Sequence, residues 1–212
     1  MGLMKMKRKI SISKILTFII IILFIILFFA IKDIIVKMKN VGQNEVQVVD
    51  NIEEYGYSMN ENDSSYFKEL FEKLKLLLKK DSYDEEEYAS LISQLFITDF
   101  YSLDKALNKN DIGGTQFVYT DYQSDFIELA KESVYATVEN NIYGNRNQEL
   151  PLVKEVTIDD VSKTSFEMKG FEDEKAYEVK LSISYVKDLD YPKEATIVLV
   201  HANNKLEIAQ LS

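Results

Sequence analysis

The chain has 212 residues, a formal net charge of −10, a single histidine and no cysteine. Without cysteine, a disulfide-stapled fold, a cysteine-linked lipid anchor and thiol catalysis are all excluded. Residues 1–39 carry eight basic and one acidic side chain, which leaves 17 basic and 34 acidic side chains in residues 40–212, a net charge of −17. Such an acidic region repels phosphate backbones, so we expect no nucleic-acid partner and favour cationic or basic partners.

Residues 15–31 form an apolar run in which Thr17 is the only polar side chain. A helix of this length reaches roughly 26 Å, close to the hydrocarbon thickness of a bilayer, and the flanking Lys14 and Lys32 can extend toward the headgroups. Phe28 lies where a signal-peptide cleavage site needs a small residue. We therefore predict an uncleaved transmembrane helix over residues 15–31 that continues as a helix to about residue 39.

Basic side chains precede this run without any acid among them, and basic flanks stay in the cytoplasm. We predict a cytoplasmic tail at residues 1–14, a tether at residues 40–62 and an extracytoplasmic domain at residues 63–212. Residues 40–62 contain scattered acids and amides with no sustained hydrophobic period, which favours a tether. The apolar cluster at residues 46–49 is also compatible with a short strand within it. The predicted location is the cell membrane, with a single pass.

Three helices are predicted in the first half of the domain. Asp63 or Ser64 caps the first, and Asp84 opens the second, whose glutamates favour the positive end of the helix dipole. Thr120 and Gln123 match a capping box for the third, which is expected to end near residue 140. Their predicted apolar faces are Phe67, Leu70, Phe71, Leu74, Leu77 and Leu78; Tyr88, Leu91, Ile92, Leu95, Phe96 and Leu103; and Phe126, Leu129, Ala130, Val134 and Val138.

The connector at residues 104–115 contains Gly113 and Gly114, which indicate backbone angles or close approaches that a side chain would forbid. A calcium loop starting at Asn108 would need an acidic residue where Tyr119 stands, and no lysine-serine or lysine-threonine pair follows the glycines to bind phosphate. The four adjacent acids at residues 84–87 point around a helix and cannot converge on one ion. We therefore expect no metal and no cofactor.

From Pro151 onward the pattern changes to strands. Residues 152–158, a short segment at 164–168, and residues 176–186, 195–202 and 206–211 alternate or are continuously apolar, with an acidic bend at residues 159–160. Turn residues between them join neighbouring strands as hairpins, which predicts an antiparallel meander. The fold class is therefore predicted as α+β: an N-terminal transmembrane helix, then about three helices packed on one face of a curved four-stranded antiparallel sheet.

This order of elements over residues 64–212 resembles the exported, nuclear-transport-factor-2-like (cystatin-like) domains of bitopic subunits in type IV secretion and conjugation channels. Residues 100–123 and 141–151 also resemble segments of uncharacterised Firmicute membrane proteins. The first resemblance implies an assembly scaffold that binds other envelope components, or further copies of itself, and has no catalytic residues to transfer. The second implies no activity.

Two residues are candidates for chemistry. Asp99 lies on or beside the apolar face of the second helix, where it is expected to accept hydrogen bonds from backbone N–H groups of the following turn. His201 lies near a strand end and could form an acid-base pair with Asp99 or Asp104. We predict a non-enzymatic binding or scaffold protein; the alternative is a ligand-binding or enzymatic cone that uses Asp99 or His201.

Overall fold

A computed structural model describes residues 27, 31–32, 47–168 and 170–212. The chain divides into two compact units, Met1–Glu45 and Val46–Ser212, and the second holds all the elements named below. The predicted tail at residues 1–14, and the predicted helix at residues 15–31 with its continuation to residue 39, lie outside the described residues except for Leu27, Ile31 and Lys32. In the part of the chain that is described, no helix has both the length and the apolar character needed to cross a membrane.

The second unit begins with an antiparallel hairpin of β1 (Val48–Ile52) and β2 (Tyr57–Asn60), joined by a short 3-10 turn. Gly56 takes a left-handed conformation (φ 68°) that closes this turn. Tyr57 and Met59 alternate along β2 and are buried. The Tyr57 hydroxyl lies 2.9 Å from that of Tyr88, which ties the hairpin to the helical core.

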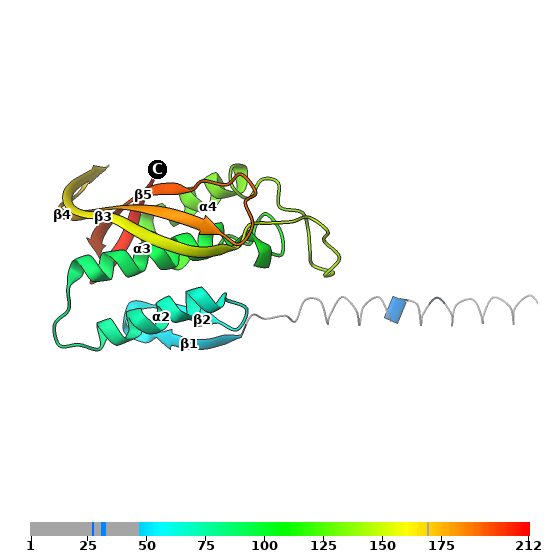
Figure 1. Cartoon of the computed structure of the whole chain (residues 1–212), viewed down its shortest axis with the longest axis horizontal. Helices are drawn as coiled ribbons and strands as arrows, with labels where there is room; N and C mark the ends of the chain where they lie inside the picture. Colours follow the sequence, from blue (N-terminus) through cyan, green and yellow to red (C-terminus); the bar gives the residue numbers. More distant parts are fainter. Residues whose placement is uncertain (1–26, 28–30, 33–46, 169) are drawn as a thin grey trace, which may run out of the picture. The chain divides into compact units, whose positions relative to one another are not determined.

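Helices α2 (Ser65–Leu78) and α3 (Glu85–Tyr101) form an antiparallel pair (Figure 1). The Ser64 hydroxyl accepts a hydrogen bond from the Phe67 N–H, so Ser64 rather than the alternative Asp63 is the N-cap of α2. The Asp84 carboxylate accepts one from the Glu86 N–H, so Asp84 is the N-cap of α3, as predicted. Helix α2 buries one stripe, as predicted. Helix α3 is buried on several sides, because α2 covers one of its faces and the large sheet covers another.

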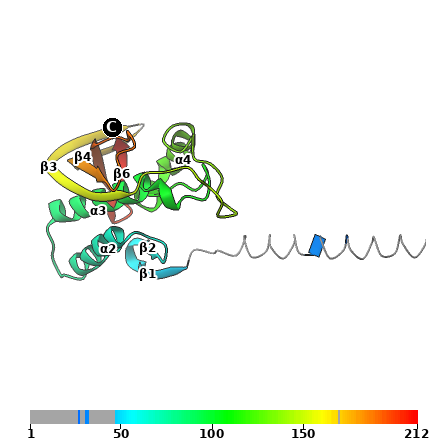
Figure 2. The same ribbon diagram turned by 45° about the vertical axis from the view of Figure 1, so that its right-hand side comes forward.

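The large sheet is an antiparallel meander in the order β3-β4-β5-β6, as the strand pattern predicts. Its strands are β3 (Val153–Met168), β4 (Phe171–Tyr185), β5 (Glu194–Ala202) and β6 (Lys205–Leu211). Residues 153–168 form one strand rather than two, since the acidic bend at residues 159–160 is accommodated as an irregularity in register. The sheet is strongly curved along its long β3–β4 hairpin (Figure 2).

The third helix differs from its prediction. Residues 120–122 form a 3-10 turn, and α4 spans only Gln123–Glu132. The predicted capping box is absent from this helix start, because the Thr120 N–H and hydroxyl donate instead to the Glu207 carboxylate. The Gln123 amide donates to the carbonyl oxygens of Thr115 and Val118. Residues 133–152 continue as turns and irregular structure. Arg146 fixes this segment by donating hydrogen bonds to the carbonyl oxygens of Ala106 and Asp104.

The predicted fold class is therefore wrong as stated. The described residues hold two sheets rather than one, and they contain no helix that could serve as the predicted transmembrane element. Residues 48–60, which the sequence assigned to a tether, form the second sheet because alternate side chains of β2 find a buried partner in α3. Nor do all three helices lie directly on the large sheet, since α2 packs mainly on α3.

We predict a loss of stability at alkaline pH from the buried tyrosines. Burial raises the pKa of the phenols of Tyr57, Tyr88 and Tyr135 above the ordinary value of about 10. Between pH 10 and the higher folded-state values, the unfolded chain releases protons that the folded chain retains, so the free energy of unfolding falls as pH rises. Within this window, each buried phenol lowers the free energy of unfolding by on the order of 1 kcal/mol per pH unit. Below the window, the phenols do not change the free energy of unfolding with pH.

Chemical denaturation followed by circular dichroism at several pH values from neutral to about 11.5 checks this slope, with tyrosinate absorbance as a second readout. The Tyr57→Phe variant is expected to have a shallower alkaline slope than the wild type. Full ionisation of all tyrosines near pH 10 in a chain that keeps its folded spectrum would contradict the prediction.

Candidate functional site

Asp99 accepts a backbone hydrogen bond from the connector, as predicted. It lies on α3, where one carboxylate oxygen accepts a hydrogen bond from the Gly114 N–H at 2.6 Å and the other pairs with the Lys105 ammonium at 2.5 Å. Lys105 also pairs with the buried carboxylate of Asp63 at 2.6 Å. The remaining oxygen of Asp63 accepts the Asn60 N–H at 2.7 Å. All four carboxylate oxygens are thus engaged within the protein.

Burial alone would lower the pKa of Lys105, but the carboxylates of Asp99 and Asp63 outweigh burial and raise it. The ammonium therefore stays charged at neutral pH, between two acids. A polar cavity of about 310 Å³ adjoins this cluster. The Tyr135 hydroxyl, which also lines the cavity, accepts from the Gly113 N–H and donates to the Phe100 carbonyl oxygen. These ion pairs and hydrogen bonds hold the connector at residues 104–115 against α3.

Both glycines of that connector meet the prediction that a side chain would not fit. A Cβ at Gly113 would lie 2.3 Å from the Asp99 carbonyl oxygen. Gly114 has φ 76°, and a Cβ there would lie 2.8 Å from the Phe96 ring. The connector is therefore held against α3 by close backbone packing.

His201 lies on β5, away from Asp99. Its Nδ1 is 2.9 Å from the Asp173 carboxylate, which also accepts the His201 backbone N–H at 2.7 Å. Its Nε2 is 3.7 Å from Glu85, and the Tyr177 hydroxyl donates to the other oxygen of Glu85. Burial alone would raise the pKa of Asp173, but the hydrogen bonds from His201 outweigh burial and lower it.

His201 and Asp99 line different cavities, and neither Asp99 nor Asp104 is a hydrogen-bond partner of His201 among the described residues. The imidazole is partly exposed and anchored by a carboxylate from the β3–β4 hairpin. This arrangement fixes the end of β5 against that hairpin. Sequence reasoning could not find Asp173, because it lies 28 residues away and carries no motif.

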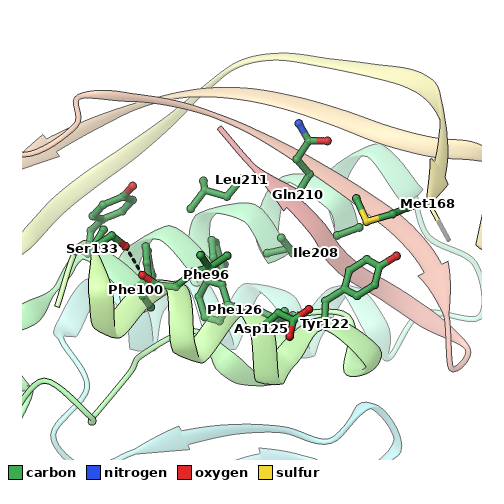
Figure 3. A pocket seen from close by; sticks show the side chains of 16 residues that line it. Phe96, Phe100, Tyr122, Asp125, Phe126, Ser133, Met168, Ile208, Gln210 and Leu211 are labelled. Atoms are coloured by element: carbon green, nitrogen blue, oxygen red, sulfur yellow. Dashed lines mark hydrogen bonds between the residues drawn. The ribbon is translucent and has the colours of Figure 1, made fainter. Parts of the chain in front are cut away.

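An apolar groove of about 420 Å³ lies between α4 and β6 (Figure 3). Rings from α3 form part of it, α4 supplies one wall, and the last residues of β6 supply the opposite wall. Its principal apolar lining residues are Phe96, Phe100, Phe126, Leu129, Ile208 and Leu211. The groove volume is in the range of about 300–1,000 Å³ typical of sites that bind small molecules or anchoring side chains.

Leu129 is the residue that sequence reasoning placed wrongly. Its position on the apolar stripe of α4 predicts burial, yet the side chain is 67% exposed on the rim of the groove. Only Ala130 of α4 is fully buried. The helix therefore presents apolar surface that the described residues leave partly uncovered.

Comparison with known proteins gives no further guidance: no protein-family model, curated protein or solved structure matches the chain. The resemblance to secretion-channel subunits thus stays a prediction.

Proposed function

We propose that residues 47–212 form a non-catalytic binding domain that engages a partner protein through the groove between α4 and β6. The observation that carries the proposal is the groove itself, an apolar hollow open at the surface and bordered by the exposed Leu129. Exposed apolar surface beside a preformed hollow is typical of interaction sites, where a few buried anchor side chains supply most of the affinity.

The proposal places this domain outside the cytoplasm, attached to the cell membrane through the apolar run at residues 15–31. Its support is the sequence: the apolar run, in which Thr17 is the only polar side chain, the basic residues before it and the acidic character of the remaining chain. The function is then that of a scaffold in an envelope assembly.

The enzymatic alternative has less support. Both carboxylate oxygens of Asp99 are engaged by Lys105 and Gly114, so this carboxylate is not offered free to a substrate. His201 has an acidic partner but lines a separate cavity, away from the apolar groove. Among the described residues, the apolar groove, the cavity beside Asp99 and the cavity beside His201 are therefore three separate places.

A cysteine-labelling experiment tests location and binding together. Because the chain has no cysteine, single substitutions Leu129→Cys and Leu76→Cys give unique thiols at two sites of similar exposure, 67% and 63%. Leu76 lies on α2, outside the groove. In intact cells, a membrane-impermeant maleimide is expected to label both thiols, but the thiol at position 129 more slowly because the partner covers it. In the purified full chain, the difference between the two rates should become smaller.

The two parts of the proposal can fail separately. Labelling that occurs only after the cells are broken open would reject the extracytoplasmic location. The same ratio of rates at positions 129 and 76 in cells and in the purified chain would mean that no partner covers the groove. The substitution His201→Ala serves as a further arm: loss of a cellular phenotype in this variant, with the fold intact, would favour the enzymatic alternative.

A further inference from the structure

Helix α4 and the turn before it carry two neighbouring stripes of side chains. The first stripe follows the groove and consists of Tyr122, Phe126, Leu129 and Ser133, at successive spacings of four, three and four residues. The second stripe has the same spacing one residue earlier and consists of the exposed carboxylates Asp121, Asp125, Glu128 and Glu132. Because residues three and four apart share a helix face, the carboxylates form a row beside the apolar stripe, and Asp125 of this row itself lines the groove.

Little positive charge offsets this acidic row. Lys131 is the only basic residue of α4, and it pairs with Glu128 at 3.1 Å. On the opposite wall, the residues of β6 that line the groove are Ile208, Ala209, Gln210 and Leu211, all uncharged. Residues 47–212 as a whole carry 33 acidic and 17 basic side chains. An occupant of the groove therefore enters a negative potential.

These features define the chemistry of the occupant. The groove accepts apolar side chains, while the row of carboxylates favours lysine or arginine side chains beside them. A bare acyl chain would satisfy the groove but leave the carboxylates without a partner. A second copy of residues 47–212, with the same acidic surface, would be repelled. A basic amphipathic polypeptide segment satisfies both stripes.

We infer that the groove between α4 and β6 binds a basic amphipathic segment of a partner protein, with apolar side chains in the groove and basic side chains along Asp125, Glu128 and Glu132. This inference rests on the proposed function and specifies the partner for the same site. It is a helix-in-groove type of recognition, in which apolar anchors determine affinity and the charges at the rim determine specificity.

The test uses two synthetic peptides of about eleven residues, three helical turns, with leucine at the same positions and either lysine or glutamate at the others. Binding to the purified full chain in phosphatidylcholine nanodiscs is measured by fluorescence anisotropy, and empty nanodiscs provide the blank. The leucine–lysine peptide is expected to bind at least tenfold more tightly than the leucine–glutamate peptide. Its affinity should fall as salt is raised.

A charge-reversal pair locates the effect. The double variant Glu128→Lys, Glu132→Lys changes the carboxylate row in the C-terminal half of α4, where the helix dipole tolerates cations. The control Glu53→Lys, Glu54→Lys makes the same change in net charge in the β1–β2 hairpin. The first variant is expected to bind the leucine–lysine peptide about tenfold more weakly, and the control less than twofold more weakly.

Three outcomes would overturn the inference: no difference between the peptides, equal weakening in both double variants, or dimerisation of the chain through the groove without peptide binding. If the thiol at position 129 is nevertheless protected in cells, the proposed binding function stands and only the chemistry of the partner is wrong. If that protection is also absent, both fail.

Discussion

Replacing Lys105 with methionine is expected to lower the free energy of unfolding by about 3–5 kcal/mol, the usual cost of removing one partner from a buried ion pair. Methionine keeps much of the apolar stem but removes the ammonium, which lies 5.7 Å from the centroid of the Phe67 ring. Asp63, which is 6% exposed, and Asp99 would then be left without their shared cation. Denaturant unfolding of the full chain, followed by circular dichroism, measures this loss.

A matched control is Lys131→Met, which removes a lysine that pairs with the exposed Glu128 on the protein surface. Such surface pairs are worth about 0–1 kcal/mol, so this variant should be nearly as stable as the wild type. Adding Asp63→Asn and Asp99→Asn to Lys105→Met should recover part of the loss, since the uncompensated charges are removed. A cost below about 1 kcal/mol for Lys105→Met alone would show that the two carboxylates do not depend on it.

The backbone hydrogen bond that Asp99 accepts could be predicted from the sequence because its donor lies nearby in the chain. A carboxylate at the edge of an apolar helix face must be satisfied by hydrogen bonds, and a glycine pair follows within fifteen residues to supply a backbone N–H. The N-caps Ser64 and Asp84 were predictable for the same reason, since capping is decided within one helical turn. The antiparallel meander follows from alternating side chains and short turns.

The β1–β2 hairpin could not be found in this way. Its two strands have only five and four residues, too few for a clear period, and its stability depends on Tyr57 meeting Tyr88 from a distant helix. The signal was the alternation of Tyr57 and Met59 after a glycine, set among acids and amides typical of a tether. Burial against a distant helix, rather than the local sequence pattern, determines that this segment forms a hairpin.

The groove illustrates a second limit of sequence reasoning. Periodicity identified the apolar stripe of α4, including Phe126 and Leu129, but it does not say what covers such a stripe. In the structure, the large sheet and α3 cover only part of it, because α4 ends at Glu132 and lies beside the edge strand β6. The uncovered part is the candidate site. Its lining comes from several elements, so no local motif could reveal it.

The substitution Gly113→Ala is expected to lower the free energy of unfolding by about 3 kcal/mol, at the upper end of the range for overpacking. The new Cβ would lie 2.3 Å from the backbone carbonyl oxygen of Asp99, a group within α3 that cannot rotate away. Either α3 or the connector must shift. A shift would strain the hydrogen bond from the Gly114 N–H to Asp99 and the one from the Gly113 N–H to Tyr135.

Gly144→Ala provides the contrast, because no atom lies within 4 Å of a Cβ at that position although its φ is 67°. Its cost is the backbone strain of about 1–2 kcal/mol alone, whereas the cost at Gly113 comes from the contact. Denaturant midpoints of the two variants, compared at equal m-values, separate these effects. If Gly113→Ala were no less stable than Gly144→Ala, the connector would not be packed against α3, and the ion pairs of Lys105 would lose the rigid support that the close backbone contact gives them.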